Sequence, residues 1–470
     1  MCKTYRPYDP DQQFLMPPSM REWLPEGHLA YFISDTIDGM DLSAIQSRYE
    51  KNLSGYPPYH PRMMTKVLFY AYCTGVYSSR KIARKLEEDV AFRVLAADNQ
   101  PDFRTVSDFR KEHLPALAEL FKQVLRLCQR AGMVRLGHVA LDGTKQKANA
   151  SKHKAMSYGR MKEESARLEA EIAELLELAG RTDEEEDREL GRDARGDELP
   201  VELAHREGRV ARIRQALSEL EAEAKAGEAQ EEPVGEQENL APKPAGKAGK
   251  KASGVPGDKT QRNFTDPESR IMRSADGSFI QGYNAQAAVD SDYQVVVAAQ
   301  VTNQASDVVH VEEMVGRIEA NTGQKPDEMS LDAGYYSDAN VKRLEAEQID
   351  VYMPPCRLKH NEYRQANPEP QPEVTTVRQR MKAKVFTDEG RAKYGLRKQT
   401  VEPVFGQIKH CRGFRQFSMR GLEACEAEWA FICAAHNLLK LAKHGAKAMA
   451  AQAARVVLPV EKAAKSLAAG

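Results

Sequence analysis

The stretch Leu136-Gly-His-Val-Ala-Leu-Asp142-Gly143 marks the point at which the character of the sequence changes. Its short apolar run is typical of a buried strand, and the Asp-Gly pair that follows is typical of a turn. We therefore expect a strand that ends at Asp142. Taken alone, an aspartate in this position is more often a turn residue than a catalytic one.

The sequence on the C-terminal side continues to alternate between strands and helices. The predicted elements are strands at 278–290 and 293–302, a helix at 307–322, a strand at 328–332, a helix at 338–348, a strand at 349–353 and a basic helical segment from Val377. With residues 158–262 set aside as an insertion, this is the element order of an RNase H-like α/β domain with a mixed sheet.

The insertion differs from its surroundings in period and in charge. Its apolar residues recur at helical spacings in two seams, which predicts a helical hairpin over 158–226. Residues 163–239 hold 25 Asp and Glu against 10 Lys and Arg, a local charge of −15, so this region should stay away from DNA. The hairpin could serve as a dimerisation arm or pack only on itself.

Residues 227–262 have almost no large apolar side chains, which predicts a flexible linker.

The first 133 residues are predicted to form a helical domain. Ser79 to Leu86 have the spacing of a basic amphipathic helix, and a second helix is expected from Thr105 to Gly132. Basic helices joined by a turn at 98–101 resemble a DNA-binding helix-turn-helix module, although a purely structural helical cap fits this passage equally well.

Composition excludes several classes of protein. No stretch approaches the roughly 18 apolar residues of a membrane span, so we expect a cytoplasmic protein without membrane contact. The seven cysteines include no Cys-x-x-Cys pair, which argues against a zinc site or a disulfide framework. The net charge of −1 hides a basic block, because residues 378–421 hold 12 Lys and Arg against 3 Asp and Glu, a local +9. That block is a candidate phosphate-binding surface.

Three acidic residues are candidates for a metal site. Asp142 and Asp332 each follow a predicted strand, and parallel strands bring such residues to one edge of a sheet. Mg²⁺ prefers hard oxygen ligands, so a carboxylate pair suits it. Glu402 is the third candidate: Thr400 and Pro403 predict that it lies near a helix start, and Lys409 would share its helix face.

Several longer motifs resemble those of bacterial insertion-sequence DDE transposases that have a helical N-terminal transposase domain. The resemblance covers nearly the whole chain, with the motifs in the expected order. They are Pro57-Pro-Tyr-His-Pro-Arg-Met-Met64, Ala140-Leu-Asp-Gly-Thr-Lys145, Arg262-Asn-Phe-Thr-Asp-Pro-Glu-Ser-Arg270, Gly282-Tyr-Asn-Ala-Gln286, Leu331-Asp-Ala-Gly-Tyr335 and Thr400-Val-Glu-Pro-Val-Phe-Gly-Gln-Ile-Lys409.

The resemblance implies that Asp142, Asp332 and Glu402 are catalytic carboxylates holding two Mg²⁺ ions, for which Mn²⁺ could substitute. The implied reaction is metal-dependent cleavage at transposon DNA ends, followed by strand transfer into target DNA. The family's helix pattern Tyr-x-x-Arg-x-x-x-Glu-x-x-x-x-x-x-Lys is nearly met by Tyr394, Arg397, Glu402 and Lys409. Four residues separate Arg397 from Glu402 instead of three, so Lys398 is an alternative base for the scissile phosphate.

The implied partners are the terminal inverted repeats and target DNA, both double-stranded, bound by a homodimer or higher oligomer at the bacterial nucleoid. The candidate DNA contacts are Tyr394, Arg397, Lys398, Lys409, Arg412 and Arg415, with Arg378, Arg380, Lys382 and Lys384 as further backbone contacts. His436 and Asn437 are interpreted as core residues, and His138 and His410 as structural or solvated. Two alternatives are a non-transposing RNase H-like nuclease and a catalytically inert DNA-binding protein from a decayed element.

These predictions divide the chain into five regions. They are a helical DNA-binding domain at 1–133, a catalytic domain at 134–157 and 263–445, a hairpin insertion at 158–226, a linker at 227–262 and a helical or disordered tail at 446–470.

Overall fold

The computed structural model describes residues 19–50, 57–151, 154–190, 201–229, 255–274, 277–356 and 376–467. Its centre is a six-stranded mixed sheet in the order β4-β5-β1-β7-β8, with β6 paired to β5 beside β4. The strands are β1 (His138–Lys147), β4 (Arg270–Arg273), β5 (Phe279–Asp290), β6 (Val296–Thr302), β7 (Glu328–Leu331) and β8 (Asp350–Tyr352). Strands β1, β7 and β8 run parallel, whereas β5 is antiparallel to its neighbours. The predicted RNase H-like mixed sheet is confirmed.

Strand β1 does not end where the sequence predicted. It continues through the Asp142-Gly143 pair to Lys147, because antiparallel pairing with β5 continues to Gly282. Only the parallel pairing with β7 stops here, at Leu141 opposite Leu331. An Asp-Gly pair indicates a turn only where the chain has no partner strand, and β5 supplies one.

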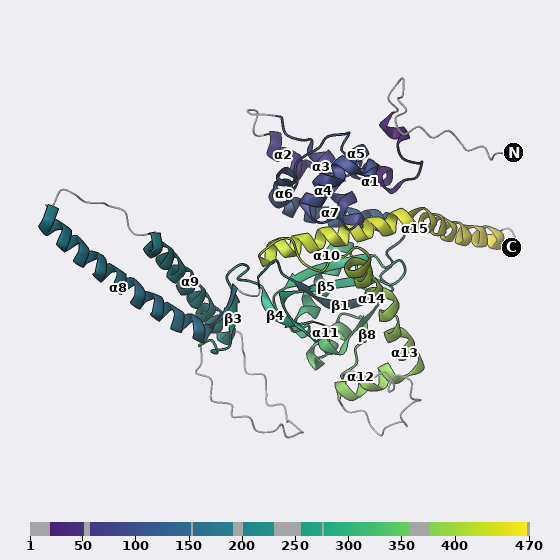
Figure 1. Ribbon diagram of the computed structural model, residues 1–470. Coiled ribbons are helices and arrows are strands. Elements are labelled where there is room, and N and C mark those ends of the chain that lie inside the picture. The colour runs from purple at the N-terminus through teal and green to yellow at the C-terminus, as the bar shows by residue number, and fades with distance from the viewer. Residues whose placement is uncertain are drawn as a thin grey trace, which may run out of the picture.

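The long helix α15 (Leu422–Leu467) separates the sheet from the N-terminal helices (Figure 1). Trp429 on this helix is fully buried, and its Nε1 donates to the Gln286 main-chain oxygen at 2.9 Å. The Asn437 amide donates to the Val296 oxygen and accepts from the Val296 nitrogen, at 2.7 and 2.8 Å. Side-chain contacts to strand backbone thus fix the helix on the sheet. The core role predicted for Asn437 is confirmed.

His436 is also a core residue, as predicted. It is fully buried, and its Nε2 donates to the Gln294 oxygen at 2.9 Å while Nδ1 accepts from Arg412 at 3.2 Å. Burial, reinforced by the nearby Arg412 charge, lowers the pKa of His436 to about 3. The imidazole is therefore neutral, and it orients Arg412 instead of acting as an acid or base.

The N-terminal helices pack over the other side of α15 (Figure 1). They are the 3₁₀ turn η1 (Met20–Glu22), α1 (Leu29–Asp38), α2 (Ser43–Glu50), α3 (Pro61–Cys73), α4 (Ser79–Glu88), α5 (Val90–Leu95), α6 (Phe103–Glu112) and α7 (Leu114–Arg130). The prediction of a single helix from Thr105 to Gly132 is wrong, because the helix is interrupted at His113. Pro115 cannot donate the next helical hydrogen bond, so it lies in the first turn of a new helix.

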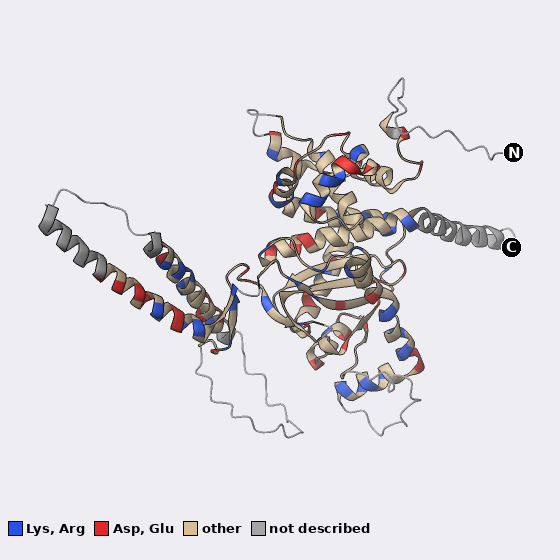
Figure 2. Ribbon diagram, in the orientation of Figure 1, with Lys and Arg blue, Asp and Glu red and all other residues tan. Residues whose placement is uncertain are grey.

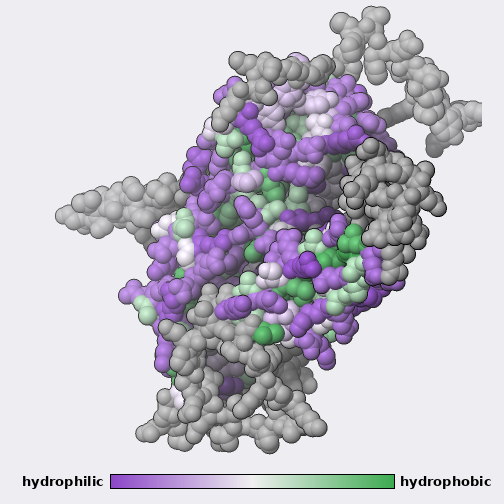
Figure 3. All heavy atoms as spheres, turned by 90° about the vertical axis from the view of Figure 1, so that its left-hand side faces the viewer, coloured by the Kyte–Doolittle hydropathy of each residue, from purple (hydrophilic) through white to green (hydrophobic). Residues whose placement is uncertain are grey.

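The predicted helical hairpin consists of α8 (Tyr158–Leu190) and α9 (Val201–Ala229), which extend away from the sheet (Figure 1). Its small core is separate from the main core and includes Met161, Leu168, Val210 and Ile213. Both charge signs occur along the hairpin (Figure 2), and the face from which it projects is mainly hydrophilic (Figure 3).

Two short strands and a set of ion pairs attach the hairpin to the sheet. Strand β2 (Ala155–Ser157) precedes α8 and pairs with β3 (Gln261–Asn263). Arg262 on β3 contacts Glu223 of α9 at 2.7 Å, and Arg270 on β4 contacts the same carboxylate at 2.9 Å. Most of the predicted linker, residues 230–254, lies outside the described residues, and its last two residues belong to β3.

Beyond β8, helical segments with many basic residues cover the β8 edge of the sheet and one face of β1. These are α12 (Val377–Phe386), α13 (Asp388–Gly395), α14 (Arg397–Gly406) and the π-helical turn η6 (Gln407–Cys411). Basic residues lie along α12 and α13 (Figure 2). Part of this charge is paired internally, because Lys384 bonds to Asp350, Lys393 to Glu328 and Arg380 to Glu345.

The helix start predicted near Glu402 is wrong. Helix α14 begins at Arg397 and includes Pro403 in its interior. A proline there removes the N–H that would bond to the Gln399 oxygen four residues earlier. The Gln294 amide donates to that oxygen instead, at 2.7 Å, so the helix tolerates the proline.

Candidate active site

Asp142 and Asp332 lie side by side at the centre of the sheet. Each directly follows the last pair of the parallel ladder between β1 and β7, Leu141 and Leu331. Asp332 also accepts from the Gly334 nitrogen at 2.7 Å, which caps the short turn η4 (Ala333–Tyr335). The structure therefore brings together two of the three predicted metal ligands.

Helix α14 places a cation against this pair. The Arg397 guanidinium donates to Asp142 Oδ2 at 3.0 Å and to the Tyr394 hydroxyl at 3.1 Å. Both members of the ion pair are largely buried, with side chains 10% and 17% exposed. Lys398, the alternative base, is exposed. In this structure Arg397 is thus the base that meets the carboxylates.

Burial raises the pKa of Asp142 to about 6, and the negative charge of Asp332 adds to the increase while Arg397 opposes it. One guanidinium therefore does not offset the cost of keeping two carboxylates together in a buried place. A divalent cation would offset it, and carboxylate oxygens are the ligands that Mg²⁺ prefers. On these grounds the aspartate pair fits a divalent metal ion.

Lys409 approaches the same face of β1. Its ammonium donates to the Thr144 hydroxyl and to the Lys145 main-chain oxygen, the latter at 2.9 Å. Thr144 lies two residues from Asp142, so both side chains point to the face of β1 that α14 covers. Burial lowers the pKa of Lys409 to about 8, which leaves most molecules charged at neutral pH.

Glu402 is placed differently from the aspartates. It is exposed on α14, and its carboxylate makes no hydrogen bond or ion pair with any other described residue. In the part of the chain that the structure describes, no three His, Cys, Asp or Glu side chains converge to hold a metal ion. The predicted triad is thus present as an adjacent pair and a third acid on a neighbouring helix.

Two further predicted DNA contacts, Arg412 and Arg415, lie beyond α14, and four lie on α12, at Arg378, Arg380, Lys382 and Lys384. Arg412 is half-buried against His436, whereas Arg415 is exposed and bonds to His410 Nδ1 at 3.1 Å. His138, predicted to be structural or solvated, is buried and bonds to Ser330 at 3.0 Å.

Sequence reasoning missed a polar network on the opposite face of β1. It consists of Lys145, Asn284, Gln286, Asp307 and Tyr335. A signal was present, because Asn284 and Gln286 are two residues apart on a strand that is otherwise buried and mainly apolar. Asp307 was expected only as the first residue of a helix.

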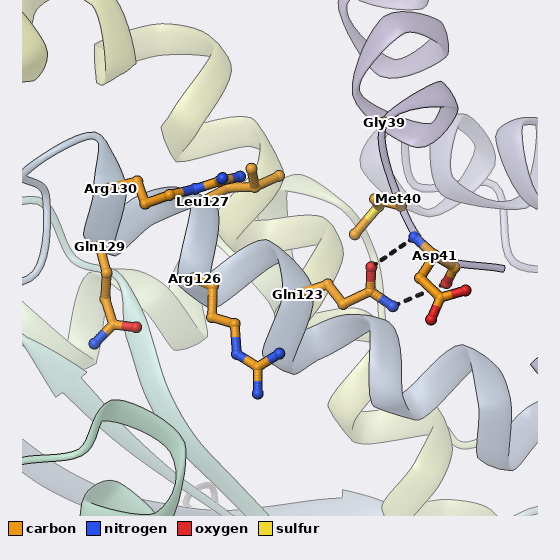
Figure 4. Close-up of a pocket in the computed structure, with 8 residues that line it drawn as sticks. All are labelled: Gly39, Met40, Asp41, Gln123, Arg126, Leu127, Gln129 and Arg130. Atoms are coloured by element: carbon orange, nitrogen blue, oxygen red, sulfur yellow. Dashed lines mark hydrogen bonds between the residues drawn. The ribbon is translucent and has the colours of Figure 1, made fainter. Parts of the chain in front are cut away.

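A separate pocket of about 700 Å³ lies between the α1–α2 loop and α7 (Figure 4). The Gln123 amide closes one side of it by bonding to the Asp41 backbone at 2.9 and 3.0 Å. Arg126 and Arg130 lie one turn apart on α7 along its rim. No predicted site residue lines this pocket.

Among the described helices, none is both long and apolar enough to cross a membrane.

Two family models match the chain. The family described as Transposase domain (DUF772) matches residues 18–112, which include α1 to α6. The family described as Transposase DDE domain matches residues 252–438, which include Asp332, Glu402 and Lys409 but not Asp142. No curated protein and no solved structure matches the chain.

Proposed function

Because the chain belongs to the insertion-sequence DDE transposases, we propose that it cuts DNA at transposon ends and joins the freed ends to target DNA. The observation that carries this proposal is the partly buried Asp142 and Asp332 pair, flanked by Arg397 and Lys409. Carboxylates that attract metal, beside cations that attract phosphate, suit phosphoryl transfer.

Transposases of the DDE family generally use divalent metal ions. We propose that Asp142, Asp332 and Glu402 hold two Mg²⁺ ions, with Mn²⁺ able to substitute. Glu402 is included because it lies on the same helix as Arg397 and has no other partner among the described residues. When bound, such a metal pair activates the attacking oxygen and stabilises the leaving oxygen.

The chain's own cations would position the DNA strand. Arg397 is fixed by Asp142 and Tyr394, so its guanidinium is oriented before a phosphate arrives. Lys409 is held by Thr144 and Lys145 of β1, two and three residues beyond Asp142, and provides a second positive charge there. Exposed Lys398 and Arg415 would contact the DNA backbone farther from the reacting phosphate.

A strand-transfer assay tests this function against both alternatives. The protein is incubated with Mg²⁺, a labelled duplex made from the DNA flanking its gene, and a supercoiled plasmid. We expect nicking at the element's end and label joined covalently to the plasmid. Cleavage without joined product would favour the nuclease, and binding without cleavage would favour the inert protein.

We propose that the N-terminal helices recognise the transposon ends through a surface formed by α4 and α6. Phe103 begins α6 and is 38% exposed, with the Arg80 and Arg104 guanidiniums 5.3 and 5.7 Å from its ring centre. Neither arginine forms an ion pair with a described residue, and both lie at helix N-termini, where positive charge is concentrated.

Buried Arg110 fixes the relative position of these two helices. It lies on α6 and donates to the Tyr77 oxygen at 2.7 Å and to the Ser79 hydroxyl at 3.3 Å, at the start of α4. The N-terminal residues of a recognition helix are those that reach base edges in helix-turn-helix proteins.

We also propose that at least two copies assemble on DNA, as a homodimer or higher oligomer, because two transposon ends have to be joined.

Replacing Arg80 or Arg104 by alanine is expected to weaken end-binding and to reduce its salt dependence by about one counterion each. Fluorescence anisotropy over a salt series measures both quantities. Arg84→Ala is the matched control, because Arg84 lies one turn further along α4 and is paired with Glu88. An equal loss in all three variants would argue against this surface.

A further inference from the structure

The face of β1 opposite α14 carries a polar network centred on Asp307. Gly143 and Lys145 point to this face, directly across from Gln286 and Asn284 of β5. Asp307 lies in the loop between β6 and the 3₁₀ turn η3 (Val308–His310). Its Oδ1 accepts from Asn284 at 2.7 Å, from Gln286 at 2.8 Å and from Lys145 at 3.2 Å. One carboxylate therefore organises donors from two adjacent strands.

The network continues to the turn that contains Asp332. Gln286 donates to Asp307 through its nitrogen and accepts, through its oxygen, from the hydroxyl of fully buried Tyr335. A Cβ on Gly334 would lie 2.9 Å from Asp332 Oδ1 and 3.5 Å from Asp307 Oδ2. These two oxygens are therefore no more than 6.4 Å apart, the sum of those distances. Both carboxylates thus lie beside Gly334.

The network also packs against the residue that follows Asp142. A Cβ on Gly143 would lie 2.4 Å from the Gln286 nitrogen and 2.9 Å from Asp307 Oδ1. Any side chain at position 143 would displace these atoms, so β1 passes the network in direct contact. Asp307 is consequently coupled to both predicted metal ligands, through backbone on one side and through Gln286 and Tyr335 on the other.

Asp307 is not itself placed as a ligand. Three donors already use its Oδ1, and Oδ2 lies 3.5 Å from Lys145. Asn284 uses its amide for Asp307 and for the Gln304 oxygen, and its own Oδ1 has no partner among the described residues. The orientation of the Asn284 amide is therefore set by its two acceptors, Asp307 and the Gln304 oxygen. Because Asp307 is the charged acceptor and also binds Gln286 and Lys145, its carboxylate is the organising group.

We propose that Asp307 is a positioning residue that fixes Asp142 and Asp332 for metal binding. The inference rests on the proposed function of the aspartate pair. Replacing a group that orients metal ligands without binding the metal itself commonly lowers metal affinity or activity by about 10- to 100-fold. In this chain the route would run from Asp307 through Gln286 to Tyr335 and the Asp332 turn.

The test is Mn²⁺ binding by the full-length protein without DNA, measured by the loss of the free Mn²⁺ signal in electron paramagnetic resonance. Asp307→Asn is expected to weaken binding by roughly 10- to 100-fold. Gln286→Met keeps every charge but breaks the link to Tyr335, and it should weaken binding to a similar extent. The double variant should be no worse than either single one, because residues acting through one route are not additive.

Lys145→Met separates this route from a simple ion pair, because Lys145 is the other charged partner of Asp307. If it reproduces Asp307→Asn while Gln286→Met binds Mn²⁺ normally, the proposed route is wrong. Wild-type affinity in Asp307→Asn, or additive losses in the double variant, would also overturn it. Asp332→Asn distinguishes failure of the Asp307 role from failure of the proposed metal site. If Asp332→Asn also binds Mn²⁺ like the wild type, the assignment of the metal site to the aspartate pair is wrong.

Discussion

Replacing Asp332 by asparagine is expected to lower the rate of end cleavage by roughly a thousandfold, equivalent to about 4 kcal/mol of transition-state stabilisation. Asparagine has the same shape and can still accept from the Gly334 nitrogen, so the turn after β7 should persist. The substitution removes a charged oxygen ligand while retaining the local fold. Binding to the transposon end should therefore be unchanged.

Single-turnover cleavage of a labelled end duplex in Mg²⁺ measures the effect, with anisotropy as the binding control. Asp327→Asn is the matched variant, because Asp327 is an exposed carboxylate just before the opposite end of β7. It should cleave at the wild-type rate. If Asp332→Asn cleaves within tenfold of the wild type, the catalytic assignment is wrong.

The same cleavage assay tests whether Glu402 is the third metal ligand. Glu402→Gln should cause a loss as large as Asp332→Asn if Glu402 completes the metal site. Because Glu402 is exposed and unpaired among the described residues, its replacement should cost little stability. Normal cleavage by folded Glu402→Gln would remove Glu402 from the proposed triad and leave the aspartate pair.

The order of elements along the chain was predictable because it depends on local periodicity. Short apolar runs and turn residues are visible in sequence, and they predicted five of the six strands of the sheet but not β4. The local ends were not predictable, because they depend on distant partners. Pairing with β5 carries β1 past Asp142, and Gln294 supplies the donor that lets Pro403 lie within α14.

The candidate site shows the same division. The sequence predicted that Asp142 and Asp332 lie together because acids that follow predicted strands meet at one edge of a sheet, and the structure has them adjacent. Asp307 was not singled out, since its contacts depend on amides brought from β5, more than 20 positions away from it in sequence. It was predicted only as the first residue of the helix at 307–322.

Buried Glu428 on α15 connects the N-terminal helices to the catalytic domain. It accepts from the Ser418 and Met419 nitrogens at 2.8 and 3.2 Å and from the Tyr72 hydroxyl on α3 at 3.3 Å. The same hydroxyl accepts from buried Arg110 on α6 at 3.3 Å. Glu428 and Arg110 are thus opposite charges linked through one tyrosine.

Glu428→Ala is expected to destabilise the protein by about 3–5 kcal/mol, because it removes the buried negative charge that is linked to Arg110 through Tyr72 and leaves two backbone nitrogens without an acceptor. Glu428→Gln should cost less, since it keeps an oxygen in place. Urea unfolding followed by tryptophan fluorescence is a direct measurement, because Trp429 is the adjacent residue.

Glu426→Ala provides the control on the same helix. Glu426 is partly exposed and pairs with Arg317 at 2.7 Å, so its removal should cost less than about 1 kcal/mol. If both alanine variants unfolded at the same urea concentration, the buried pair would not be what stabilises this junction. A lower midpoint for Glu428→Ala alone would show that α15 joins the two domains through Glu428, Tyr72 and Arg110.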